Sequence, residues 1–203
     1  MPRLAGQIDQ AKTQAILDAA VLVFGERGIA ASMEAIARRA KVSKQTIYNH
    51  FGSKPELLRA IVERRVAEIT APLLAPEGAA DPQEALAAFA RFMLGAVMAP
   101  RGTSLLRMTV QSAADQPDLA RAFYEAGPRT SRQRLADFLE METKAGRMAV
   151  DDPPLAAEFF AGMVIGGQQL AHLLGLGREA DPAEIDAIAR EAARRFMRAY
   201  AAA

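Results

Sequence analysis

Apolar residues recur at three- and four-residue steps along most of the chain, which is the spacing of one face of an α-helix. The pattern is clear from Ile16 to Phe24, where polar side chains occupy the opposite side, and again over residues 82–98. The alternation of apolar and polar residues that is typical of a β-strand is not found in the sequence. We therefore expect an all-α fold.

Capping and turn residues divide this pattern into separate helices. Ser53-Lys54-Pro55-Glu56 is a capping box, with Pro tolerated in the first helical turn. Asp81-Pro82 and Asp181-Pro182 begin two later helices in a similar way. The expected helices cover residues 8–27, 32–40, 43–51, 53–72, 82–98, 103–114, 117–126, 129–144, 155–174 and 182–200.

The stretch from Ser32 to Phe51 reads as two short helices on either side of a tight turn. Ser32 and Ser43 are placed to cap them, because a serine hydroxyl accepts a hydrogen bond from the unpaired amides of a first turn. Ile47 and Phe51 face inward in the second helix, while polar residues cover its outward side. The sequence therefore predicts a helix-turn-helix, whose second helix enters the major groove of DNA.

Hydroxyls, amides and lysines on such a helix can reach base edges and phosphates. On composition alone, the alternative is an ordinary surface hairpin with a solvated polar face. The candidate DNA-binding residues are Ser32, Lys41, Ser43, Lys44, Gln45, Thr46, Tyr48, Asn49, His50 and Lys54.

Residues 12–65 resemble the N-terminal DNA-binding domain of the TetR family of transcriptional regulators. The matching residues are Ala40-Lys41-Val42-Ser43, Thr46-Ile47-Tyr48-Asn49-His50-Phe51, Ser53-Lys54 and Leu57-Leu58. The resemblance implies that Lys54 contacts phosphate and that the helix it begins transmits the state of a ligand. Lys41 and Gln45 stand where Gly is frequent in the family. Lys41 carries a backbone cost if the turn needs a positive φ, and Gln45 adds an amide that can read adenine.

Composition and charge narrow the class of protein. Among 203 residues, 51% are apolar and none is cysteine, so disulfides, thiolate metal sites and cysteine nucleophiles are excluded. No apolar run is long enough to span a bilayer and the first residues do not resemble a secretory signal, so we expect a soluble, cytoplasmic protein. Residues 1–70 hold 11 Lys and Arg against 7 Asp and Glu, and the remainder holds 14 against 17. A basic N-terminal third is typical of a part that meets phosphate.

We expect two domains: a three-helix helix-turn-helix domain over residues 1–54, and a larger helical ligand-binding and dimerisation domain over 55–203. The helix expected over 155–174 is apolar nearly all round, and the helix over 182–200 has an apolar stripe opposite its arginines. These two helices, paired with their copies, predict a four-helix interface of a homodimer. The alternative is that both belong to the core of a single chain.

A ligand pocket is a weaker prediction, because aromatic and Met residues at helical spacing usually form the core. TetR-like regulators enclose a small-molecule site in this region, and residues 98–128 (with APRG, LLRM and FYEAGP) resemble the C-terminal domain of AefR-like members. His172 is interpreted as a hydrogen-bonded core residue and not as a metal ligand. The candidate ligand-binding residues are Phe89, Phe92, Met93, Arg107, Met108, Gln111, Phe123, Tyr124, Phe159, Met163, Gln168 and His172.

The resulting hypothesis is a repressor that leaves an inverted-repeat operator in double-stranded DNA when it binds an unidentified small apolar or aromatic effector. We expect no cofactor, no metal and no membrane partner. A transcriptional activator and a ligand-independent DNA-binding protein of the same fold are the alternatives. An enzyme is the least favoured, since the sequence lacks a nucleophile elbow, a zinc motif and a phosphate loop.

Overall fold

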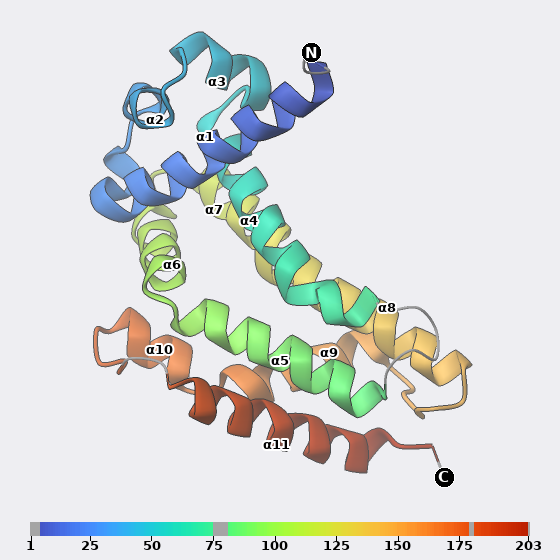
Figure 1. The fold of residues 1–203 in the computed structure, drawn as a ribbon. Coiled ribbons are helices and arrows are strands. Elements are labelled where there is room, and N and C mark those ends of the chain that lie inside the picture. The colour runs from blue at the N-terminus through green and yellow to red at the C-terminus, as the bar shows by residue number, and fades with distance from the viewer. Residues whose placement is uncertain (1–4, 75–80, 179–180, 203) are drawn as a thin grey trace. The chain divides into compact units, whose positions relative to one another are not determined.

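The protein is described here by a computed structural model that covers residues 5–74, 81–178 and 181–202. These residues form helices and turns without a β-strand, which confirms the all-α prediction. The elements are α1 Ala5–Arg27, η1 Gly28–Ala30, α2 Met33–Ala40, α3 Lys44–Phe51, α4 Lys54–Thr70, η2 Ala71–Leu74, α5 Pro82–Met98, α6 Pro100–Ser112, α7 Pro117–Tyr124, the π-helical turn η3 Glu125–Arg129, α8 Thr130–Lys144, α9 Pro153–Ile165, α10 Gln168–Leu173 and α11 Pro182–Tyr200 (Figure 1). None of the helices in these ranges is long and apolar enough to cross a membrane.

The chain divides into two compact units. The first comprises residues 1–64 and 104–126, and the second comprises residues 65–103 and 127–203. The division falls inside α4, so the first eleven residues of that helix belong to the same unit as α1, α2 and α3, although the predicted domain boundary lies at 54/55. A compact unit need not be a functional one, and the functional division at 54/55 stays a prediction.

The first unit is built around the apolar face of α1. Ile16 and Ala20 on this helix are fully buried, and α1 packs against α2, which in turn packs against α3. Ile36 of α2 and Ile47 of α3 are likewise inaccessible to solvent. An ion pair between Arg64 and Asp18 joins α4 to α1 at 2.7 Å. The helix-turn-helix therefore rests on a small core of its own.

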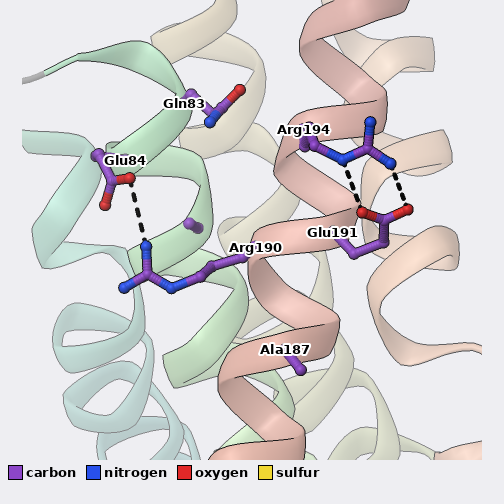
Figure 2. A pocket seen from close by; sticks show the side chains of 7 residues that line it. Gln83, Glu84, Ala187, Arg190, Glu191 and Arg194 are labelled. Carbon is purple, nitrogen blue, oxygen red and sulfur yellow. Dashed lines mark hydrogen bonds and ion pairs between the residues drawn. The ribbon is translucent and has the colours of Figure 1, made fainter.

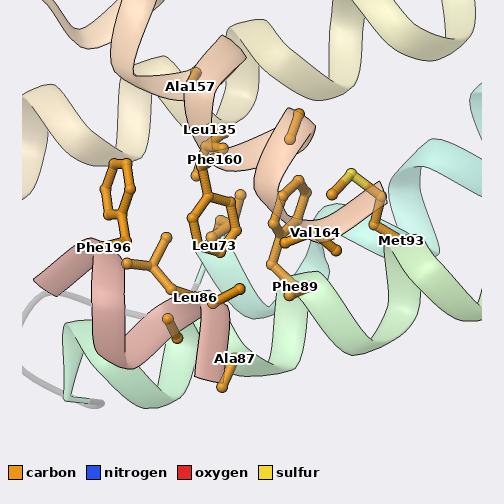
Figure 3. Packing of buried hydrophobic residues seen from close by; sticks show 14 of the residues in the cluster. Leu73, Leu86, Ala87, Phe89, Met93, Leu135, Ala157, Phe160, Val164 and Phe196 are labelled. Atoms are coloured by element: carbon orange, nitrogen blue, oxygen red, sulfur yellow. The ribbon is translucent and has the colours of Figure 1, made fainter. Parts of the chain in front are cut away.

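The second unit has a larger core, supplied mainly by α5, α8, α9 and α11 (Figure 3). Aromatic rings connect three of these helices: Phe160 of α9 lies 6.2 Å from Phe89 and 5.0 Å from Phe196, measured between ring centroids. Phe196 lies 4.6 Å from Tyr200. Ring pairs at such separations add to the free energy of burial.

Two helix boundaries differ from the prediction in ways that have a clear structural cause. The expected helix over 155–174 is two helices, because Gly166 takes φ 48° and ψ −136°, a backbone conformation that ends α9. The helix expected to begin at Thr103 begins at Pro100, and the Thr103 hydroxyl donates to the carbonyl of Val97 at 3.1 Å instead of capping. A β-carbon on Gly102 would lie 2.2 Å from the Ala96 carbonyl oxygen, so close packing requires glycine at this position.

Most of the apolar stripe of the final helix is buried within its own chain. Ile185, Ala189 and Phe196 of this stripe are buried in the second unit, where α11 packs against α5 and α9. The outward side of α11 carries Arg190 and Arg195. The chain itself therefore covers most of this stripe, and the contribution of α11 to an interface with a second copy stays a prediction.

Candidate DNA-binding surface

Both helices of the helix-turn-helix begin at the serines that the sequence predicts. The Ser32 hydroxyl accepts from the backbone N–H of Ala35 at 3.1 Å. The Ser43 hydroxyl accepts from the N–H of Thr46 at 3.0 Å and also bonds the Thr46 hydroxyl at 2.8 Å. A serine cap typically stabilises a helix by about 1 kcal/mol. The caps fix where α2 and α3 start, and these predictions are confirmed.

The turn between the two helices is held by a lysine in a left-handed conformation. Lys41 has φ 56° and ψ 40°, and it is the one non-glycine residue with positive φ among those described. Its N–H donates to the Arg38 carbonyl at 3.3 Å, and the next N–H, of Val42, donates to the Ala37 carbonyl at 3.0 Å. These two bonds form a Schellman motif, which satisfies carbonyls at the end of α2. Lys41 therefore has the positive φ that, by the prediction from the sequence, makes a non-glycine residue costly in this turn.

The recognition helix α3 is anchored by one face and open on the others. Ile47 is fully buried, whereas Lys44, Gln45, Tyr48 and Asn49 are exposed. The exposed residues form two ridges, each made of residues four apart. In the first, the Lys44 ammonium lies 5.7 Å from the centre of the Tyr48 ring, within range of a cation–π interaction. In the second, the Gln45 amide nitrogen donates to the Asn49 side-chain oxygen at 2.7 Å.

Lys54 opens α4 next to the recognition helix. The Ser53 hydroxyl accepts from the N–H of Glu56 at 3.3 Å, as the capping box predicts. The Lys54 ammonium lies 5.9 Å from the centre of the Phe24 ring. Burial lowers the pKa of this ammonium below its ordinary value of 10.5, since the charged form is less well solvated. A phosphate placed beside it would restore a favourable environment for the charge.

All ten candidate DNA-binding residues lie within residues 32–54 of the first unit. Eight are exposed, and only Thr46 and Lys54 are half-buried. A surface-exposed set of hydroxyls, amides and cations is what contact with DNA requires.

A basic hollow in the same unit was not foreseen from the sequence. It has a volume of about 300 Å³ and is lined by Val23, Glu26, Arg27, Ala35, Arg38, Arg39 and Lys41. Arg39 pairs with Glu26 at 3.0 Å, so part of its charge is neutralised within the chain. The adjacent residues Arg38 and Arg39 are the feature of the sequence from which this basic hollow could have been predicted.

The candidate ligand-binding residues are divided between the units. Arg107, Met108, Gln111, Phe123 and Tyr124 belong to the first unit and the other seven to the second. Phe89, Met93 and Met108 are buried, and Phe92, Tyr124, Phe159 and Met163 are exposed by 51%, 54%, 56% and 44%. Both ring nitrogens of His172 face backbone carbonyls, of Gln168 at 2.9 Å and of Arg178 at 3.1 Å.

A second hollow, of about 210 Å³, lies between α5 and α11 (Figure 2). Its lining is charged: Arg190 pairs with Glu84 at 3.5 Å, and Arg194 pairs with Glu191 at 2.6 Å. None of the twelve candidate ligand-binding residues lines this hollow or the basic one. Within the described ranges, no group of three or more His, Asp or Glu is placed to hold a metal ion.

Three packed helices with a capped and anchored recognition helix define a helix-turn-helix protein, a class that binds DNA. The sequence comparisons specify the family. Residues 16–61 match the model for bacterial regulatory proteins of the tetR family, and residues 84–202 match that for the C-terminal domain of AefR-like transcriptional repressors. The chain belongs to the TetR family of bacterial transcription regulators, and it is a regulator and not an enzyme.

Individual relatives agree with this assignment. The HTH-type transcriptional regulator BetI of Rhizobium meliloti is 29% identical over 168 residues, which is 82% of this chain and 79% of that protein. A TetR-family regulator of known structure from Mesorhizobium loti superposes with a TM-score of 0.80 at 27% identity, covering 95% of this chain and 98% of the other. The flavonoid-responsive regulator FrrA superposes with a TM-score of 0.69 at 33% identity over the same shares.

Proposed function

We propose that this regulator is a homodimeric repressor that binds an inverted-repeat operator and releases it when a small apolar or aromatic effector binds. DNA binding by this protein is supported above all by the surface of α3. There the amide ridge of Gln45 and Asn49 lies beside the ridge of Lys44 and Tyr48, on a helix anchored by a buried face. Amides suit base edges, cations suit phosphates, and hydroxyls can contact either. We assign base contacts to Gln45, Thr46 and Asn49, and phosphate contacts to Ser32, Lys44, Tyr48 and Lys54.

The proposed dimer is supported by an apolar ridge on the outer face of α9. Leu155, Phe159 and Met163 follow one another at four-residue steps and are exposed by 48%, 56% and 44%. Leu170 on α10 is exposed by 60%. An apolar ridge of this length is unfavourable in water, and a second copy related by a two-fold axis would cover it. Phe159 and Met163 then serve the dimer and not the effector.

A repressor is favoured over an activator by the match to AefR-like repressors over residues 84–202. An aromatic effector is favoured by the likeness to FrrA, which is named for its response to flavonoids. The effector would act by favouring a conformation whose two recognition helices no longer fit the operator. This function places the protein in the cytoplasm with the DNA.

The test is selection of bound duplexes from a random DNA pool, with full-length protein at near-physiological salt. We expect an enriched inverted repeat, which flavonoids or related planar aromatics release in a competition assay. Transcription from a promoter that carries the enriched sequence should rise when the protein is absent. Weak, salt-sensitive binding without enrichment would contradict sequence-specific regulation, and a fall in transcription would contradict repression.

A further inference from the structure

The amide side chains of Gln45 and Asn49 are joined before any DNA is present. The Gln45 Nε2 atom lies 2.7 Å from Asn49 Oδ1, and the two residues stand one helical turn apart on the exposed side of α3. The helix below them is capped by Ser43 and anchored by the fully buried Ile47. The pair is therefore held on a rigid base, as accurate recognition requires.

This bond determines which hydrogen-bonding groups each amide can offer to a base. A primary amide has two N–H donors and an oxygen with two lone pairs. After donating one hydrogen to Asn49, Gln45 retains one N–H and its own oxygen. Asn49 turns its oxygen toward Gln45, so both of its N–H groups remain available to donate. Gln45 can then donate and accept together, whereas Asn49 acts chiefly as a donor.

These two sets of groups match different base edges in the major groove. Adenine presents an acceptor, N7, beside a donor, N6–H₂, which suits the remaining donor and acceptor of Gln45. Guanine presents two acceptors, and thymine presents the O4 acceptor, which suit the two remaining N–H groups of Asn49. Cytosine presents a donor there and would meet the Asn49 N–H groups unfavourably.

We propose that Gln45 and Asn49 act as one reading unit for two neighbouring base pairs, with adenine opposite Gln45 and guanine or thymine opposite Asn49. This inference rests on the proposed function, since it concerns the same DNA-binding surface. Each amide fixes the orientation of the other, so the two base preferences are coupled. If the two residues contacted their bases independently, a substitution at one residue would change only the base preference at its own base pair.

The experiment starts from the operator enriched by the wild-type protein. Binding constants are measured for the sixteen duplex variants of the two-base step, with wild type, Asn49→Ala and Gln45→Glu. For wild type, we expect replacement of the favoured base to weaken binding roughly 5- to 150-fold at either position. Asn49→Ala should remove the preference at its own base pair and also reduce the adenine preference by several-fold, because the Gln45 amide is then free to rotate.

The variant Gln45→Glu is a more discriminating test than Asn49→Ala, because it should change which bases are preferred opposite Asn49. A carboxylate at position 45 can only accept, so the Asn49 amide must rotate to donate to it and turn its oxygen outward. The preference opposite Asn49 should then shift from guanine or thymine toward adenine or cytosine. Lys44→Ala, on the neighbouring ridge, is the matched control: it should weaken all sixteen duplexes alike and reduce the salt dependence by about one phosphate contact.

The outcomes separate this inference from the proposed function. An enriched operator with an adenine preference that Asn49→Ala leaves unchanged, or a second-base preference that Gln45→Glu leaves unchanged, would overturn the coupled unit and leave the regulator intact. The absence of any enriched sequence would overturn both. Thermal unfolding of each variant at the wild-type temperature confirms that a lost preference reflects the surface and not a misfolded helix.

Discussion

The guanidinium of Arg147 binds both oxygens of the Glu142 carboxylate, with Nε 2.5 Å from Oε2 and Nη2 2.9 Å from Oε1. The Glu142 side chain is only 4% exposed, whereas that of Arg147 is 33% exposed. The N–H groups of Arg147 and Met148 also donate to the Glu142 backbone carbonyl, at 3.0 and 3.3 Å. The charge of the buried Glu142 carboxylate near the end of α8 is thus neutralised by Arg147, which follows that helix.

Removing this partner should destabilise the second unit strongly. Arg147→Ala leaves a buried carboxylate without its cation, and we expect a loss of about 2–4 kcal/mol in the free energy of unfolding, measured with urea. The double variant Glu142→Leu with Arg147→Met replaces the pair by apolar groups and should lose less. Equal losses in both variants would show that packing, and not the charge, determines the effect.

Gly102 should not tolerate even one added carbon. A β-carbon there would lie 2.2 Å from the backbone oxygen of Ala96, which cannot move without distorting α5. We expect Gly102→Ala to destabilise by about 1–3 kcal/mol. Gly95 is the matched control, because a β-carbon at this position in α5 would meet nothing within 4 Å. Gly95→Ala should stabilise the helix by about 0.5–1 kcal/mol, and a similar loss in both variants would contradict the steric argument.

The left-handed backbone of Lys41 predicts an unusual ranking of substitutions. Glycine adopts this conformation without strain but adds freedom to the unfolded chain, so the two effects nearly cancel in Lys41→Gly. Valine is branched at the β-carbon and should cost about 1–2 kcal/mol in Lys41→Val. Chemical unfolding of both variants tests the ranking. A valine variant as stable as glycine would show that the turn relaxes to negative φ.

The apolar ridge on α9 predicts how the dimer can be separated. Phe159→Glu places a charge in the proposed contact and should reduce the mass measured by sedimentation from dimer to monomer. Phe92→Glu is the control, because its side chain is exposed to a similar extent, 51% against 56%, but lies on α5. Sedimentation of Phe159→Glu as a dimer would place the interface elsewhere.

Stability at acidic pH should depend on Glu191. Hydrogen bonds from Arg194 and then Arg195 lower the pKa of its carboxyl from 4.5 to about 2. A lowered native pKa means that the stabilisation is present above the unfolded pKa of about 4.5 and is lost as the pH falls toward 2. Glu191→Gln should therefore flatten the curve of unfolding free energy against pH between these values. An unchanged slope would locate the acid sensitivity in other carboxylates.

The local features of the helix-turn-helix could be predicted because a cap needs only a few neighbouring residues. Ser32 and Ser43 are read as caps from sequence alone, and the structure places both as expected. The break at Gly166 could not be predicted, because a glycine within an apolar helical pattern is often tolerated and its φ depends on the surrounding packing.

The partner of an apolar stripe is a harder prediction than the stripe itself. Periodicity identifies the buried face of α11 but does not distinguish α5 of the same chain from a second copy. Four-residue spacing likewise places Gln45 and Asn49 on one side of α3, yet the direction of the hydrogen bond between them depends on side-chain rotamers. Both relationships depend on how side chains and helices pack in three dimensions, which the spacing of residues does not determine.

The Schellman turn at Lys41 and the two serine caps also bear on the thermodynamics of DNA recognition. These features satisfy backbone groups at the ends of α2 and α3 in the free protein. The DNA-binding surface therefore needs little further folding when it binds a duplex. Segments that fold on binding show a large negative heat-capacity change and an entropic penalty. Calorimetry of this domain with its operator should accordingly report the burial of contact surface alone.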